Sequence, residues 1–180
     1  FGTKSDLYIS DADEVMKYMH TGTKEGMQEK LDDMAKELTE QGMPSKLCIE
    51  LQYKYHITVE GKDYALSCQQ GVGTKSTDYK YTEGLIPQNK HEIAITPMIS
   101  EMTGAKIGDT VIIHYGQEDL ECVVTAYFQT MNLLGEVVRL HEDAPTDFQY
   151  ISSAMHYQIN FTDSPSEEEI EYRKERIKEL

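Results

Sequence analysis

The stretch that decides the fold is LCIELQYKYHITV, residues 47–59, together with KDYALSC, residues 62–68, which follows the pair Glu60-Gly61. Apolar side chains occupy every second position of residues 47–59, a period typical of a long strand with one buried face. If Val59 pairs with Lys62, the apolar side chains of both segments lie on the same face. Because a strand register must be consistent in this way, the two segments predict a β-hairpin.

An amphipathic helix is expected before this hairpin. Its apolar stripe is spaced by four, three and four residues, which is typical of a helix packed on a sheet, and consists of Met27, Leu31, Met34 and Leu38. Gly42 and Pro44 provide the expected stop signal. Further upstream, Asp6–Ser10 predicts a short strand and Asp11–His20 a short helix.

Short strands dominate the chain after the hairpin. Residues 69–80 are loop-like, and a short helix is expected at Pro97–Thr103. The expected strands are Glu92–Thr96, Thr110–Tyr115, Leu120–Phe128, Glu136–Leu140 and His156–Phe161. Ser164-Pro165-Ser166-Glu167 has the spacing of a capping box with Ser164 as the N-cap, which predicts the start of a final helix.

Composition and charge limit the classes of function. The chain has 180 residues, 17 basic and 32 acidic, with a formal net charge of −15. This charge argues against nucleic acid as a partner and against a polybasic membrane-binding surface, since both need clustered cations. No apolar run reaches the ~18 residues that a membrane helix needs. Because the chain starts at Phe1 and not at Met, we expect it to be a piece of a longer protein, so the missing membrane segment describes only this piece.

Two groups of residues have the composition of functional motifs but not the spacing. Gly71-Val72-Gly73-Thr74-Lys75-Ser76 resembles a phosphate-binding loop, but Thr74 separates Gly73 from Lys75. A phosphate-binding loop needs these glycine and lysine positions to be adjacent, so a flexible surface loop is expected. His141-Glu142-Asp143 contains ligand-type residues, but neighbours in an extended chain point in opposite directions, so surface polar residues are expected.

The cysteines give no framework for a disulfide-rich or zinc-binding protein. There are only Cys48, Cys68 and Cys122, without a closely spaced pair. The hairpin register places Cys48 and Cys68 on opposite faces, so these two should not pair. Three buried free thiols are expected, and a bridge from Cys122 to either of the other two stays open if the compartment is oxidising.

A family resemblance lies in residues 84–113. The run is Gly84-Leu85-Ile86-Pro87, then Glu92-Ile93-Ala94-Ile95-Thr96, then Ile99-Ser100-Glu101-Met102-Thr103-Gly104, then Ile107-Gly108-Asp109-Thr110-Val111-Ile112-Ile113. It resembles the extracytoplasmic, MacB-like periplasmic core domain of FtsX-like ABC transporter permeases. Leu120–Phe128 fits a following hairpin strand of that family, except that Ala126 stands where the family has Gly. The positions that define the motif are Gly84, Pro87, Glu92, Gly104, Gly108 and Asp109, and from the residues themselves they have structural roles in turns.

The resemblance implies an α+β domain with two lobes. Residues 1–68 together with 149–180 would form a helix-on-sheet lobe (βαβ-type, Porter-like), and residues 69–148 an inserted, mostly-β (Sabre-like) lobe. The domain would lie on the extracytoplasmic side of the cell membrane, held by transmembrane helices of its parent permease. A separate cytoplasmic ABC ATPase would hydrolyse ATP, and the domain would couple that hydrolysis to substrate export or extracytoplasmic signalling. No catalytic residue, cofactor or metal is expected, and the isolated domain is expected to be monomeric.

Residues 129–135 hold the candidate partner contacts. Met131, Leu133 and Leu134 are apolar within a loop-like stretch between two strands. They would contact a peptide, lipid or lipoprotein substrate or a cell-envelope protein, unless they pack between the lobes. Two other classes of function stay open, namely a secreted peptide- or protein-binding module and an enzyme of undetermined class.

Overall fold

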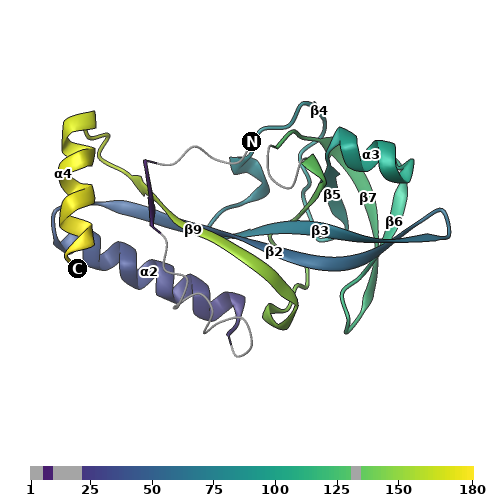
Figure 1. Cartoon of the computed structure of the whole chain (residues 1–180), viewed down its shortest axis with the longest axis horizontal. Helices are drawn as coiled ribbons and strands as arrows, with labels where there is room; N and C mark the ends of the chain where they lie inside the picture. The colour runs from purple at the N-terminus through teal and green to yellow at the C-terminus, as the bar shows by residue number, and fades with distance from the viewer. Residues whose placement is uncertain (1–5, 10–21, 131–134) are drawn as a thin grey trace.

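Two long antiparallel strands form the central ribbon of the molecule. The computed structural model describes residues 6–9, 22–130 and 135–180, and in it β2 (Ser45–Val59) and β3 (Lys62–Val72) run along the long axis (Figure 1). The register Val59↔Lys62 continues through Tyr53↔Cys68, which confirms the predicted hairpin. Glu60 and Gly61 both have positive φ, 49° and 77°. A two-residue turn needs this conformation to match the twist of the strands.

The strands around this ribbon form one mixed sheet, part of which is closed. The order is β1-β9-β2-β3-β8-β5-β7-β4, and β6 pairs with both β2 and β7. A ring therefore runs from β2 through β3, β8, β5, β7 and β6 back to β2. The remaining bounds are β1 Leu7–Ile9, β4 Glu83–Gly84, β5 Glu92–Ile95, β6 Thr110–His114, β7 Asp119–Tyr127, β8 Val137–Leu140 and β9 Ile151–Phe161. With the three helices that the described residues form, this sheet confirms the α+β fold class.

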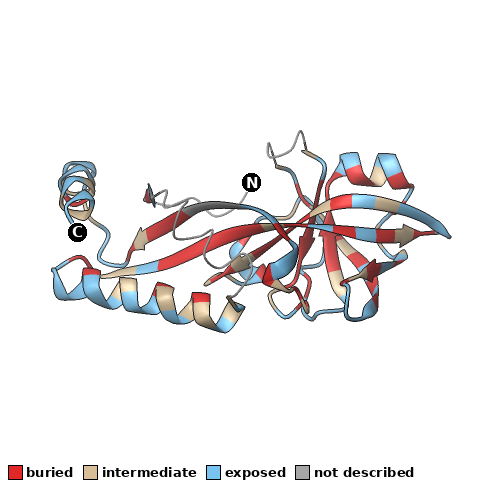
Figure 2. Cartoon of the chain, turned by 60° about the horizontal axis from the view of Figure 1, so that its bottom comes forward, coloured by how far each residue is buried: buried red, intermediate tan, exposed pale blue. Residues whose placement is uncertain are grey.

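Helix α2 (Lys24–Glu40) covers one face of the sheet at the end of the molecule away from the closed ring (Figure 1). Met27, Leu31 and Leu38 are buried, and Figure 2 shows exposed residues along the side of the helix turned away from the sheet. Each such side chain stabilises the fold by about 1.5–3 kcal/mol when it leaves water. The helix begins where Thr23 Oγ1 accepts the backbone N–H of Gly26 at 3.0 Å. The predicted amphipathic stripe is therefore the contact with the sheet.

Helix α3 (Pro97–Thr103) confirms the predicted short helix, and α4 (Glu167–Lys178) begins later than predicted. The N-cap of α4 is Ser166, whose Oγ accepts the N–H of Glu169 at 3.2 Å. The predicted cap, Ser164, has a φ of 50°. An N-cap residue needs extended backbone, so Ser164 belongs to the turn before the helix.

Two strand boundaries also differ from the expectation. Residues 69–72, predicted as loop, belong to β3, and β9 begins at Ile151 rather than at residue 156. The period of apolar residues breaks at Gln69 and Gln70, yet both side chains are buried. Gln70 Nε2 donates to the carbonyl of His141 at 2.8 Å, so the buried amide of Gln70 has a hydrogen-bond partner. Because glutamines occupy these buried positions, the end of β3 has no apolar alternation to detect.

Two expectations about helices are left to report. The helix expected at Asp11–His20 lies outside the described residues. Among the helices that the structure describes, none has the length and apolar character needed to cross a membrane.

Candidate functional site

The six positions of the 84–113 motif lie at turns and element ends. Gly84 pairs with Ala126, and a Cβ there would lie 2.2 Å from the carbonyl oxygen of Thr125. Gly104 ends α3 with a φ of 79°. Asp109 Oδ2 accepts the N–H of Lys106 at 2.9 Å across the turn that contains Gly108, and Glu92 Oε1 accepts the N–H of Gln88 at 2.8 Å. Pro87 is buried. These positions shape the backbone.

The candidate partner contacts Met131, Leu133 and Leu134 lie outside the described residues. Just after them, the carbonyl of Gly135 accepts a hydrogen bond from Thr96 Oγ1, the side chain that also caps α3. Their role stays a prediction.

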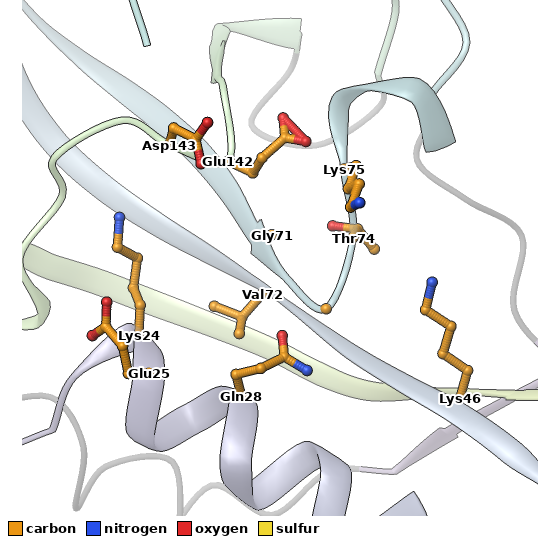
Figure 3. A pocket seen from close by; sticks show the side chains of 11 residues that line it. Lys24, Glu25, Gln28, Lys46, Gly71, Val72, Thr74, Lys75, Glu142 and Asp143 are labelled. Carbon is orange, nitrogen blue, oxygen red and sulfur yellow. The ribbon is translucent and has the colours of Figure 1, made fainter. Parts of the chain in front are cut away.

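The described chain contains an open cleft of about 580 Å³ (Figure 3). Four parts of the chain form it: the start of α2, the start of β2, the end of β3 with the residues after it, and the turn that follows β8. The residues that line it are Lys24, Glu25, Gln28, Lys46, Gly71, Val72, Gly73, Thr74, Lys75, Glu142 and Asp143. Its volume is within the usual range for small-ligand sites.

A buried polar network lies beneath one wall of this cleft. It consists of Glu50, Gln69, Tyr79 and Arg139, all buried. Arg139 Nη1 lies 3.4 Å from Glu50 Oε2, and Arg139 Nη2 donates to Gln69 Oε1 at 3.0 Å. The guanidinium also stacks over the Tyr79 ring at 3.7 Å, and the Tyr79 hydroxyl donates to Glu50. Burial raises the pKa of Tyr79, which keeps the phenol protonated as a donor.

Gly71 is the point where the cleft and the polar network meet. A Cβ there would lie 2.0 Å from Thr74 Oγ1 and 2.7 Å from the Tyr79 hydroxyl oxygen. Only glycine lets the side chains of Thr74 and Tyr79, whose oxygens are 2.7 Å apart, cross over the strand at this position. The expectation of a surface loop at 71–76 is therefore wrong for Gly71 and Val72, which belong to β3, and for Ser76, which is buried. Residues 73–75 lie outside helices and strands, as expected.

The expectation of surface polar residues at 141–143 is wrong for His141, which is buried, and correct for Asp143, which is exposed. The N–H of Asp143 donates to His141 Nδ1 at 3.0 Å, so Nδ1 acts as an acceptor. His141 Nε2 lies 2.9 Å from Glu142 Oε1, which makes Nε2 the donor in the neutral ring. The prediction failed because it assumed extended chain, whereas the N–H of Ala144 bonds back to the carbonyl of His141 in a turn.

The Glu142 carboxylate connects this turn to the segment after β3. The backbone N–H of Ser76 donates to it at 3.1 Å and the Ser76 hydroxyl at 2.9 Å, in addition to the contact with His141. These three donors fix Glu142 at the cleft. A carboxylate held in this way acts mainly as a structural clamp between two loops.

The three lysines of the cleft differ in their partners. Lys24 Nζ donates to the carbonyl of Ala144 at 2.6 Å, and burial lowers its pKa although Glu25 and Asp143 act in the opposite direction. Lys46 and Lys75 are exposed, and the structure gives neither an ion pair with a described residue. Figure 3 shows these two lysines on one side of Gly71 and Val72, with Lys24 and Glu25 on the other.

The cysteines are free and buried. Burial raises the pKa of Cys48 and of Cys68 to about 12 and that of Cys122 to about 11. These thiols stay protonated near neutral pH and are poor nucleophiles. The described residues also contain no group of three His, Cys, Asp or Glu side chains that could hold a metal ion.

A partly closed mixed sheet, with long strands extending beyond the ring and α2 packed on β2, defines the α+β fold of this chain. The chain is similar to the periplasmic region of MacB from Actinobacillus actinomycetemcomitans, with a TM-score of 0.51 and 11% identity over 77% of this chain and 68% of that one. The chain thus has a MacB-like periplasmic core fold, which confirms the resemblance inferred from residues 84–113.

Two more solved structures are similar at lower scores. A domain of a putative permease protein from Porphyromonas gingivalis has a TM-score of 0.49 and 10% identity over 81% of this chain and 74% of that one. The extracellular domain of the noncanonic ABC-type transporter YknZ from Gram-positive bacteria has a TM-score of 0.46 and 9% identity over 91% of this chain and 86% of that one. No protein-family model matches the chain, and no curated protein matches it.

Proposed function

We propose that this chain is the extracytoplasmic domain of an FtsX-like ABC transporter permease. The observation that carries the proposal is the fold shared with the periplasmic region of MacB over 77% of the chain. In this function the domain does no chemistry of its own. It couples ATP hydrolysis by a cytoplasmic ATPase to substrate export or to a signal outside the membrane, and it is joined to the membrane through helices of its parent permease.

The pairing of β2 supports a mechanical role. The first part of β2, from Ser45 to Tyr53, pairs with β9, and the part from His56 to Thr58 pairs with β6 of the closed ring. One continuous strand therefore belongs to both ends of the molecule. A hydrogen-bonded ribbon resists bending more than a loop does, so a displacement at the helix-bearing end would be transmitted to the closed ring.

The proposal also divides the domain into two lobes. Residues 1–68 with 149–180 would move as the lobe nearer the membrane helices, and residues 69–148 as the inserted lobe. α4 is tied to this first lobe through Arg173, which bonds to Asp163 at 2.7 Å and lies over the Phe161 ring at 4.8 Å. Such ties would let α4 pass a force to β9, to which Phe161 belongs.

The proposed extracytoplasmic location of the domain is tested by labelling an introduced thiol in the parent protein. Because the three native thiols are buried and protonated, the wild-type chain should give little background with a membrane-impermeant maleimide. Glu101→Cys places a thiol on the exposed side of α3. We expect this variant to be labelled in intact cells and to stay with the membrane fraction. Labelling only after lysis would overturn the proposed location.

Purification of the parent protein in detergent tests whether it binds a cytoplasmic ATPase, and tests the alternative of a secreted binding module. We expect a second polypeptide with vanadate-sensitive ATP hydrolysis to copurify with it. Deleting residues 1–180 from the parent should abolish export or signalling while that hydrolysis persists. A secreted binding module, the alternative, would instead release this chain into the medium with no ATPase attached.

A further inference from the structure

The edge of β3 becomes uncovered inside the cleft. β8 pairs with β3 only at Ser67, Cys68 and Gln69, whereas β3 continues to Val72. In the hairpin register closed by Val59 and Lys62, every second residue of β3 directs its N–H and C=O away from β2. Ser67 and Gln69 are two of these residues, and Gly71 is the next.

The backbone groups of Gly71 therefore point toward the space that β8 leaves empty. Across that space lie Glu142 and Asp143, which follow β8 after its last residue, Leu140. An uncovered edge of this kind is a template for one more extended segment. The polar network under Gly71 fixes the strand, so the edge is preorganised.

The charges of the cleft select the segment that would fit. At one side, Lys24 is engaged by Ala144 and lies among Glu25 and Asp143. At the other side, Lys46 and Lys75 have no ion pair with any described residue, in a chain whose net charge is −15. Unpaired cations beside a free strand edge complement carboxylates on an extended chain.

We propose that the cleft binds an extended acidic peptide segment, which pairs its backbone with the Gly71 edge of β3 and places its carboxylates between Lys46 and Lys75. This is strand addition of a short segment, with backbone hydrogen bonds for affinity and the two lysines for selectivity. The inference does not depend on a membrane location, so its test stands apart from that of the proposed function.

The test is an NMR titration of the ¹⁵N-labelled chain with acetyl-Val-Glu-Val-Glu-Val-amide. We expect saturable shifts of the amide signals of Gly71 and Gly73. Weakening between 150 and 500 mM salt is expected because exposed charge pairs are screened. The lysine-for-glutamate version of the probe should give no shifts at equal concentration. Equal shifts with both probes, or none with the acidic one, would overturn the proposal.

Two variants separate the lysines from general electrostatics. Lys46→Glu with Lys75→Glu should raise the Kd about tenfold, as expected for the loss of two exposed ion pairs. Lys36→Glu with Lys90→Glu changes the net charge equally at exposed positions that do not line the cleft. The control should therefore bind like the wild type, and an equal loss in both pairs would show that the cleft lysines have no special role.

The backbone contact is tested on the probe itself. A version methylated at its backbone nitrogens keeps both carboxylates but cannot donate to a strand edge, so it should bind at least fivefold more weakly. Sodium phosphate tests the small-anion alternative. If phosphate alone shifts Gly71 and Gly73 to the same extent, or if the methylated probe binds as well as the original, the strand-addition proposal is wrong.

Discussion

The 84–113 motif and the polar network under the cleft are held by different kinds of interaction. In the motif, the hydrogen bonds of Asp109 and Glu92 reach residues three and four positions away. Gly84, which lies against Thr125 and Ala126, is the exception. In the network, Arg139 reaches Glu50 and Gln69, which are 89 and 70 residues away. Local contacts leave a pattern that can be found in a sequence, whereas contacts between distant strands do not. The recognisable part of this chain therefore builds the fold, and the cleft is formed by residues without a recognisable pattern.

The largest expected effect is in the polar network. Arg139→Met leaves the Glu50 carboxylate buried without its cation, which should lower the free energy of unfolding by about 3–5 kcal/mol. Urea unfolding followed by circular dichroism measures this loss. Glu50→Leu combined with Arg139→Met removes both charges and should recover much of it. Additive losses would show that the two side chains do not act as a pair, and that the polar network does not depend on this contact between distant strands.

The next effect is at a glycine of the motif. Gly84→Ala brings a Cβ to 2.2 Å from a backbone oxygen, at a φ of 89°, and should cost about 3 kcal/mol. Gly71→Ala should cost about 1–3 kcal/mol, because its shortest contact is to the side chain of Thr74.

The control for these glycines uses that side chain. Thr74→Ala removes the clashing oxygen and should lessen the loss caused by Gly71→Ala, and no single side-chain truncation should rescue Gly84→Ala. Melting temperatures of the single and double variants measure both effects. Rescue of Gly84→Ala by such a truncation would mean that the motif, too, depends on side-chain contacts.

The sequence predicted the hairpin, the amphipathic helix and the short strands because each depends on a period or on turn residues within a few positions. It predicted the wrong structure at residues 69–72, which belong to β3, and the wrong exposure for His141, which is buried. Gln69 and Gln70 are buried among partners from β8 and the turn that follows it, so this end of β3 has no apolar alternation. A signal was present, since Gly71 and Gly73 interrupt a strand-like run. The reason for these glycines is that the side chains of Thr74, Tyr79 and Glu50 meet at Gly71, which no local pattern encodes.

A smaller effect is expected at the start of α4, where the capping-box spacing predicted the wrong N-cap. Ser166→Ala removes the hydroxyl that caps α4 and should cost about 1 kcal/mol. Ser164→Ala removes the hydroxyl of the residue that was predicted to be the cap and should cost less than half of that. Urea unfolding of the two variants compares them directly. Equal losses would mean that both serines stabilise the start of the helix.

The smallest effect is expected at the unpaired lysines of the cleft. Lys46→Gln and Lys75→Gln should each change the free energy of unfolding by less than about 0.5 kcal/mol, because an exposed side chain without a partner contributes little to folding. Lys24→Met loses the bond to Ala144 and should cost about 1 kcal/mol. Thermal unfolding of the three variants ranks them. If Lys46→Gln or Lys75→Gln costs as much as Lys24→Met, that lysine is part of the fold, and the charge available for an acidic segment is reduced accordingly.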